Sequence, residues 1–301
     1  QDPEQYKWSH FKDHNGIELL NFYKQMLLDL SQNQNELIAS IYANAQTRLR
    51  EPRHLQQLIN EFDKLDWFSI KADGLGDLYE GLLEKNATET KSGAGQYFTP
   101  RPLINSIVHC IQPKPSEVIQ DPACGTAGFL IAADAYIKQH NDLYALTEAQ
   151  TQFYTLEAFT GVELVPNTRR LAQMNCLLHD IGGEQGAIKL GNSLGPVGES
   201  LPKADVILAN PPFGTSKGGE ASITRDDLPF NTSNKQLAFL QHIYKNLKPG
   251  GRAAVVLPDN VLFEAGQGTS IRQDLMNKCN VHTILRLPTG IFYAQGVKTN
   301  V

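Results

Sequence analysis

Apolar side chains in residues 1–90 recur every three or four positions, the spacing that places them on one face of an α-helix. The pattern returns four times and predicts amphipathic helices around residues 19–30, 37–45, 55–65 and 75–83. No cluster of side chains suited to catalysis accompanies it. We therefore expect residues 1–90 to form a helical domain that serves packing and contact with a partner.

From residue 116 onward, short apolar runs alternate with helical stretches. Each run has the length and composition of a buried strand. The predicted strands cover residues 118–120, 159–164, 187–190, 204–209, 253–257 and 281–287. Repeated strand–helix units predict an α/β fold with a mostly parallel sheet and helices on both faces. We expect this second domain to cover residues 91–301.

Four polar residues lie at or just after the ends of predicted strands: Asp121, Glu163, Asn192 and Asn210. In open α/β sheets, ligands bind outside the carboxyl ends of the strands. We therefore expect one crevice to collect all four side chains.

The first predicted strand leads into residues 121–128, Asp-Pro-Ala-Cys-Gly-Thr-Ala-Gly. Gly125 and Gly128 permit a tight turn and the close approach of a ligand to the backbone. The segment has neither the G-x-G-x-x-G spacing nor the Gly-Lys-Ser/Thr of a P-loop, which argues against a nucleoside triphosphate. Glu163, at the end of the second strand, suits the hydroxyls of a ribose, and an exposed acid beside a helix N-terminus is the alternative. S-adenosylmethionine, a nucleoside cofactor without a pyrophosphate, fits these features.

The strand over residues 204–209 ends at Asn210, Pro211, Pro212 and Phe213. Neither proline donates a ladder hydrogen bond, so the strand stops there. The tip presents an amide, a carbonyl without a ladder partner and an aromatic ring, which suit a flat polar group such as a nucleobase. A simple turn is the alternative, since Asn and Pro both favour turns.

Residues 96–101, Gln-Tyr-Phe-Thr-Pro-Arg, follow a loop of small residues at 91–95. Thr99 is suited to cap a helix that has Pro100 at its first position. On its own, this hexapeptide is also consistent with a simple helix start and aromatic packing.

Charge and cysteine content restrict the function further. The net charge of -5 argues against strong DNA binding by this chain alone, because such binding relies on basic surface. The four cysteines form no C-x-x-C pair, so we expect neither a zinc site nor disulfides, and a cytoplasmic location. No apolar run is long enough for a transmembrane helix, and no signal peptide is visible. Because the first residue is Gln1, we expect the chain to be a fragment.

The segment at 121–129, followed by Asn-Pro-Pro-Phe at 210–213, resembles the amino-methyltransferases that act on N6 of adenine in DNA. Residues 96–101 and the N-terminal helices resemble the modification subunit of type I restriction–modification systems. The resemblance covers most of the chain, and the order of its motifs is similar to that family's gamma arrangement. It implies an S-adenosylmethionine-dependent methyltransferase fold with a seven-stranded mixed sheet, whose antiparallel last strand begins at residues 298–301.

The resemblance also implies roles for individual residues. Asp121 would lie near the methionine end of the cofactor and Asn192 near its adenine, although relatives often carry an acid at the position of Asn192. The cofactor contacts that it implies are Gln96, Tyr97, Phe98, Thr99, Pro100, Arg101, Asp121, Thr126, Ala127, Gly128, Glu163 and Asn192.

The target base would be held by residues 210–213. The amide oxygen of Asn210 and the carbonyl of Pro211 would accept the two N–H bonds of the adenine amine, which localises its lone pair, while Phe213 would stack on the ring. Positioning and electrostatics then supply the rate without a metal or a covalent intermediate. The adenine must leave the duplex, at a cost of roughly a few kcal/mol.

As partners, the resemblance implies duplex DNA, a specificity subunit that binds two copies of this chain, and a restriction subunit, with no membrane. Two alternatives stay open: a methyltransferase for an RNA base or protein glutamine, and a non-catalytic scaffold that holds the cofactor beside a DNA-reading partner. The loop at 214–234, with Lys217, Gly218, Gly219 and Arg225, is either a segment that closes on DNA or a surface loop.

Overall fold

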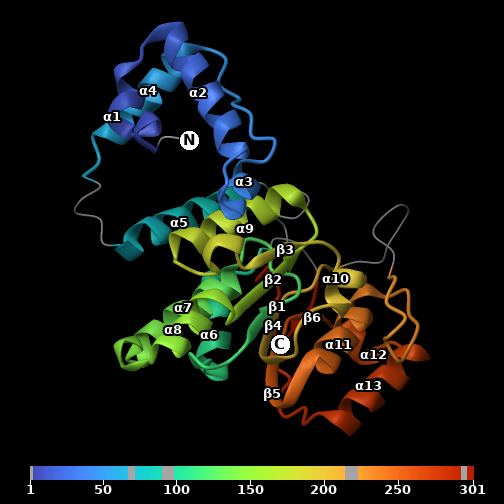
Figure 1. The fold of residues 1–301 in the computed structure, drawn as a ribbon. Helices are drawn as coiled ribbons and strands as arrows, with labels where there is room; N and C mark the ends of the chain where they lie inside the picture. The colour runs from blue at the N-terminus through green and yellow to red at the C-terminus, as the bar shows by residue number, and fades with distance from the viewer. Residues whose placement is uncertain (1–2, 67–71, 90–97, 214–222, 293–296) are drawn as a thin grey trace. The chain divides into compact units, whose positions relative to one another are not determined.

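The computed structural model describes residues 3–66, 72–89, 98–213, 223–292 and 297–301 (Figure 1). The chain divides into two compact units, Gln1–Asp77 and Leu78–Val301. The division falls inside one helix, α5 (Ala72–Glu89). The predicted domain boundary near residue 90 stays a prediction.

The N-terminal unit is helical and contains the first three predicted helices, while the fourth corresponds to α5, which spans the division. Leu19 and Leu20 pack against Leu55 and Ile59, with Phe11 closing the cluster. Burial of each such side chain stabilises the unit by roughly 1.5–3 kcal/mol. Its elements before α5 are η1 (Pro3–Tyr6), α1 (Trp8–Asp13), α2 (Gly16–Ser31), α3 (Glu36–Tyr42) and α4 (Pro52–Asp63).

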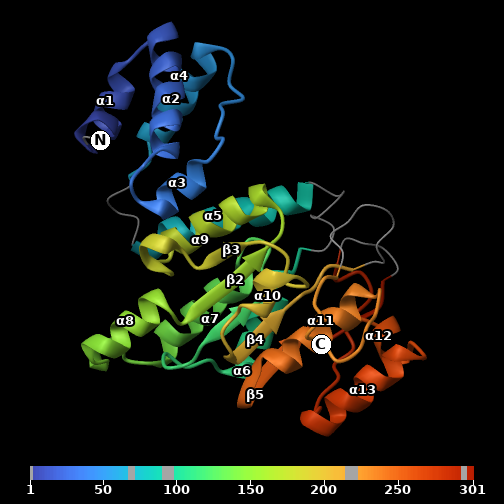
Figure 2. The ribbon, with the colours of Figure 1, turned by 45° about the vertical axis from the view of Figure 1, so that its right-hand side comes forward.

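The second unit contains a five-stranded parallel sheet. The strands are β1 (Ile119–Asp121), β2 (Phe159–Glu163), β3 (Ile188–Leu190), β4 (Ala204–Ala209) and β5 (Leu247–Val255). Their order is β3-β2-β1-β4-β5, and Figure 1 labels all five strands in this order. Figure 2 shows β3, β2, β4 and β5 in the same order after a turn of 45°. The chain moves outward from β1 through β2 and β3, then returns to the other side of β1 for β4. The crevice where the order reverses, between β1 and β4, is where such sheets bind ligands.

Helices cover both faces of this sheet, as the alternation along β4 shows. Val206 and Leu208 join a core with α6 and α7, while Ile207 and Ala209 pack with Ile243 of α11. The longer helices are α6 (Arg101–Ile111), α7 (Gly128–His140), α8 (Glu148–Leu156), α9 (Pro166–Leu178), α11 (Lys235–Asn246) and α13 (Gln267–Lys278). The short helices are η3 (Leu143–Ala145), η4 (Gly183–Gln185), α10 (Pro196–Glu199) and α12 (Asn260–Phe263).

The prediction of one seven-stranded sheet is not met within the described residues. β6 (Leu257–Pro258) and β7 (Thr299–Asn300) form a separate antiparallel pair. Pro258 has no N–H to donate, which limits how far this pair extends. The predicted strand at 281–287 is also absent as a strand. Most of its apolar side chains stay exposed, Ile284 at 58% and Leu285 at 55%, while Leu287 at its end is buried, so burial fixes the end of the segment but not the rest.

Backbone hydrogen bonds nevertheless place the end of that segment beside β7. The N–H groups of Leu285 and Leu287 donate to the carbonyls of Val301 and Thr299, both at 2.9 Å. Arg286 forms an isolated antiparallel bridge with Asn300. Within the described parts of the chain, we find no helix with the length and apolar character needed to cross a membrane.

Candidate active site

A cavity of about 460 Å³ lies at the carboxyl ends of β1 to β4. The strand-end residues Asp121, Glu163, Asn192 and Asn210 all line it, so the predicted convergence of these four is confirmed. The other predicted residues that line it are Phe98, Thr99, Thr126, Gly128 and Pro212.

The turn between β1 and α7 forms the floor of this cavity. Asp121 Oδ1 accepts the N–H of Ala123 at 3.0 Å, which fixes the start of the turn. Gly125 and Ala127 take positive φ angles of 55° and 70°, and α7 begins at the next residue. A Cβ on Gly128 would lie 3.1 Å from Ile104 Cδ1, so the close packing of α6 leaves little room for any other residue.

Two carboxyl groups, the buried Asp121 and the half-buried Glu163, dominate the electrostatics of the cavity. Burial, with a smaller contribution from the charge of Glu163, raises the pKa of Asp121 to about 8. Burial also raises the pKa of Glu163, against the N–H groups of Val165, Gly125 and Leu164. Glu163 Oε1 accepts from Val165 N at 2.8 Å and Oε2 from Gly125 N at 3.1 Å, so both oxygens are oriented. Such a pocket favours a ligand that brings positive charge and hydroxyl donors.

A third side of the cavity is formed by residues 192–194, just after β3. Asn192 Oδ1 accepts the N–H of Leu194 at 2.9 Å, a local turn that orients the side-chain amide. The Ser193 hydroxyl donates to the carbonyl of Pro122 at 2.6 Å, which joins this wall to the β1 turn.

The tip at residues 210–213 is held by side chains from distant segments. Asn210 Nδ2 donates to Thr99 Oγ1 at 2.8 Å. Gln236 Nε2, from α11, donates to the carbonyl of Pro212 at 2.9 Å. The Phe213 ring meets Phe292 edge to face, with centroids 5.7 Å apart. The predicted target-binding residues are therefore anchored from three sides.

Several predicted residues are not among the described residues that line the cavity: Pro100, Arg101, Ala127, Pro211 and Phe213. Arg101 instead supports the floor from behind. Its guanidinium pairs with Glu80 and donates to the carbonyl of Gly128 at 3.2 Å. Gln96 and Tyr97, and Lys217, Gly218 and Gly219 of the predicted loop, lie outside the described residues.

Sequence reasoning missed the supports of the site. Asn175 of α9 donates to the carbonyl of Thr126 at 2.9 Å and to Glu80 at 3.2 Å. Lys235 lines the cavity, and Gln236 holds the tip. The missed apolar lining includes Leu83, Ile104, Phe129, Leu171, Leu194 and Phe239. For Lys235 and Gln236, the sequence offered one signal: polar residues that interrupt the apolar pattern of α11.

Comparison with known proteins identifies the family. The profile of the N-6 DNA methylase family matches residues 70–301. The EcoKI methylase subunit of Escherichia coli K12 is 58% identical over 99% of this chain and 58% of its own length. The StySPI methylase subunit of Salmonella potsdam is 57% identical over the same shares. This chain thus spans a little under three fifths of the length of these relatives.

Solved structures agree with that family. The crystal structure of the EcoKI M protein (EC 2.1.1.72) has 52% identity and a TM-score of 0.64, over 99% of this chain and 56% of that one. A structure determined for the assembly and conformational transition of a type I restriction–modification system has 29% identity and a TM-score of 0.81, over 100% of this chain and 62% of that one. The profile match covers most of the chain and includes every wall of the cavity, so this chain belongs to the N-6 DNA methylase family.

Proposed function

We propose that this chain is the catalytic part of the modification subunit of a type I restriction–modification system. It transfers a methyl group from S-adenosylmethionine to N6 of a flipped-out adenine in duplex DNA. One observation carries the proposal: the amide tip at Asn210 and the acids Asp121 and Glu163 line the same cavity. A base-holding tip beside a site for a cationic nucleoside is the arrangement that methyl transfer to a base requires.

The cavity fits S-adenosylmethionine by size and chemistry. Its volume of about 460 Å³ lies within the range of roughly 300–1,000 Å³ typical of small-ligand pockets. In this proposal Glu163 accepts the ribose hydroxyls, Asp121 faces the methionine ammonium, and Asn192 contacts the adenine. The turn at 126–128 lies against the cofactor, with Phe98 and Thr99 as further contacts. When bound, S-adenosylmethionine supplies an electrophilic methyl group on sulfur.

We propose supporting roles for the predicted cofactor residues that do not line the cavity. We propose that Pro100 starts α6 and that Arg101 and Ala127 hold the floor of the cavity. Gln96 and Tyr97 complete the cofactor site in this proposal, on the strength of the motif that they form with Phe98 and Thr99.

The target tip orients the adenine amine. Asn210 donates through its amide nitrogen to Thr99, which orients the side chain, and in this proposal its oxygen accepts an N–H of the base. The carbonyl of Pro211 accepts the second N–H, Pro212 shapes the tip, and Phe213 stacks on the ring. With both N–H bonds held, the lone pair of the amine is directed at the methyl group. Water exclusion and fixed dipoles supply the remaining stabilisation.

In this proposal, DNA binding requires partner subunits, because this chain is acidic overall. We propose a specificity subunit that reads the DNA and binds two copies of the methylase subunit, and a restriction subunit in the full complex. The free state of all four cysteines is consistent with action in the cytoplasm. We further propose that β6, β7 and residues 285–287 belong to the outer part of a seven-stranded methyltransferase sheet, as the antiparallel hydrogen bonds between them suggest.

The test is methyl acceptance. The full-length subunit, assembled with the specificity subunit encoded beside it, is incubated with radiolabelled S-adenosylmethionine and duplex DNA, RNA or protein. We expect label only in DNA, recovered as N6-methyladenine. Label in RNA or in protein glutamine would change the substrate class. Cofactor binding without any labelled product would instead make the chain a scaffold.

A further inference from the structure

Helix α11 has a buried polar edge that the proposed mechanism does not use. Three of its polar side chains, those of Gln236, Gln241 and His242, are at most 1% exposed. Buried polar side chains require partners. The partner of Gln236 is Pro212 in the tip, and the partner of His242 is Arg225, which in turn bonds Ser193 in another wall of the cavity. This single helix therefore contacts both halves of the site.

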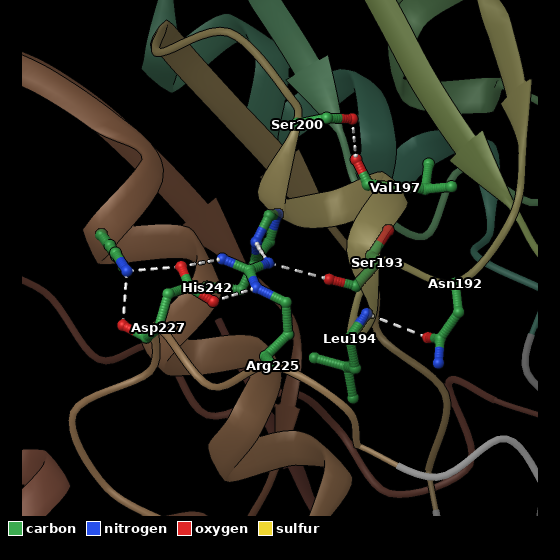
Figure 3. Close-up of polar contacts among 9 residues, drawn as sticks. Asn192, Ser193, Leu194, Val197, Ser200, Arg225, Asp227 and His242 are labelled. Carbon is green, nitrogen blue, oxygen red and sulfur yellow. Dashed lines mark hydrogen bonds and ion pairs between the residues drawn. The ribbon is translucent and has the colours of Figure 1, made fainter.

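Helix α11 contacts the wall at residues 192–194 through Arg225, which lies outside α11 and is 8% exposed (Figure 3). Its Nε and Nη2 form a bidentate pair with Asp227 at 2.5 and 2.6 Å. Its Nη1 lies 3.0 Å from His242 Nδ1 and donates to the carbonyl of Ser193 at 3.1 Å. A planar guanidinium is the one side chain that can make this set of contacts at once.

These contacts fix the cavity wall at residues 192–194. The backbone N–H of Thr224 donates to the carbonyl of Leu194 at 2.9 Å, next to the Arg225 bond to Ser193. The segment around Arg225 is itself pinned to α11, because Gln241 exchanges two hydrogen bonds with the backbone of Phe230, at 2.9 and 3.0 Å.

His242 supports Arg225 as a neutral acceptor. Burial first, and then the charge of Arg225, lowers the pKa of His242 to about 3, against the opposite effect of Asp227. Lys203 and Lys245 lower this pKa further. The imidazole therefore stays uncharged at neutral pH, and its Nδ1 can accept the Arg225 proton throughout that range.

Helix α11 contacts the tip at residues 210–213 through Gln236, which donates to the carbonyl of Pro212. Gln236 lies six positions before His242 on the same helix, and Asn234 caps that helix by accepting the N–H of Leu237. The two contacts are mounted on one rigid element but act on separate walls.

We propose that Arg225 and Gln236 are positioning residues for the two halves of the site. Arg225 holds the wall at 192–194 against the cofactor, and Gln236 holds the tip at Pro212 against the target base. The inference rests on the proposed function, because it assigns one wall to S-adenosylmethionine and the other to adenine.

The experiment compares Arg225→Lys with Gln236→Leu in the full-length subunit assembled with its specificity partner. Arg225→Lys keeps the charge but loses the fork, so we expect the Kd for S-adenosylmethionine to rise about tenfold. Its methyl transfer rate at saturating cofactor should stay within about twofold of wild type. Gln236→Leu should leave the Kd unchanged and lower the transfer rate at saturating cofactor about tenfold, since it removes one buried donor.

Asn246→Leu is the matched control, because it removes a buried amide from the other end of the same helix, where its partners Gln120 and Pro202 do not line the cavity. We expect it to lower the thermal midpoint while changing cofactor affinity and transfer rate together by less than about threefold. Asp227→Asn is a milder alternative that loosens Arg225 and should weaken cofactor binding in the same direction. All variants are first checked for folding by thermal unfolding.

The measurements distinguish a failure of the proposed function from a failure of the positioning roles of Arg225 and Gln236. A wild-type complex that does not bind S-adenosylmethionine contradicts the proposed function. A wild-type complex that binds and methylates, while Arg225→Lys and Asp227→Asn leave cofactor affinity unchanged, overturns the assignment of Arg225. Parallel losses of affinity and rate in both Arg225→Lys and Gln236→Leu overturn the separation of the two walls.

Discussion

The side of the cavity proposed for the cofactor and the side proposed for the target base are built from different kinds of contact. On the cofactor side, Asp121 and Glu163 are oriented by backbone N–H groups of the turns that follow their own strands or a neighbouring one. On the target side, the tip is held by the side chains of Thr99, Gln236 and Phe292, which come from distant segments. Local backbone geometry fixes the first wall, whereas tertiary packing fixes the second. Substitutions should therefore separate cofactor affinity from methyl transfer.

The largest effect on cofactor affinity is expected at Glu163. Glu163→Gln removes the charge and leaves one oxygen for the two N–H groups of Gly125 and Val165. We expect the Kd for S-adenosylmethionine to rise about a hundredfold, because hydrogen bonds to a charged group are worth roughly 1.5–3 kcal/mol. Isothermal titration calorimetry measures this Kd. Glu157→Gln, at an exposed position, is the control, and an unchanged Kd for Glu163→Gln would remove the ribose assignment.

The pH dependence of cofactor binding tests Asp121. With a pKa of about 8 in the free protein, raised from 3.8, this carboxyl group is protonated at neutral pH. A cationic ligand favours the ionised form, so binding releases a proton. Affinity should then rise by up to about tenfold per pH unit as the pH increases towards 8, and level off above it. The same titration on Asp121→Asn should be flat, and a wild-type profile without slope would contradict the role of Asp121.

A smaller effect is expected on the target side at Thr99. Thr99→Val keeps the shape of the residue but removes the oxygen that accepts from Asn210 Nδ2. The loss of this bond, worth about 1 kcal/mol, should lower the transfer rate at saturating cofactor about fivefold. Single-turnover kinetics with duplex DNA measure the rate. A change in cofactor affinity without a change in rate would leave Thr99 with only its proposed contact to the cofactor.

The smallest effect should follow the loss of the ring contact behind the tip. Phe292→Leu keeps an apolar side chain but removes the edge-to-face pair with Phe213. Such pairs contribute about 0.5–1.5 kcal/mol, so we expect a rate loss of about threefold and an unchanged cofactor Kd. If Phe292→Leu matches wild type in both measurements, this contact has no part in positioning the tip.

The same contrast explains what the sequence could and could not predict. The helices of residues 19–83 and the runs ending at Asp121 and Asn210 were readable, because periodicity and strand ends are local properties. The strand predicted at 281–287 was wrong, since its apolar residues before Leu287 are exposed in this chain. Arg101 carries the family motif but lies behind the cavity floor, paired with Glu80. That pairing, like the bond from Gln236 to Pro212, joins segments that no local pattern connects.

The most direct test of the central claim is the substitution Asn210→Ala, with cofactor binding and single-turnover methyl transfer measured on the same full-length complex. The claim is that Asn210 acts on the target base while Asp121 and Glu163 hold the cofactor in the adjoining part of one cavity. The account predicts that Asn210→Ala binds S-adenosylmethionine with wild-type affinity and forms no N6-methyladenine. Asn141→Ala, which removes an amide that donates to the carbonyl of Ile137 at the end of its own helix, should behave as wild type. Methyl transfer by Asn210→Ala at the wild-type rate would contradict the account.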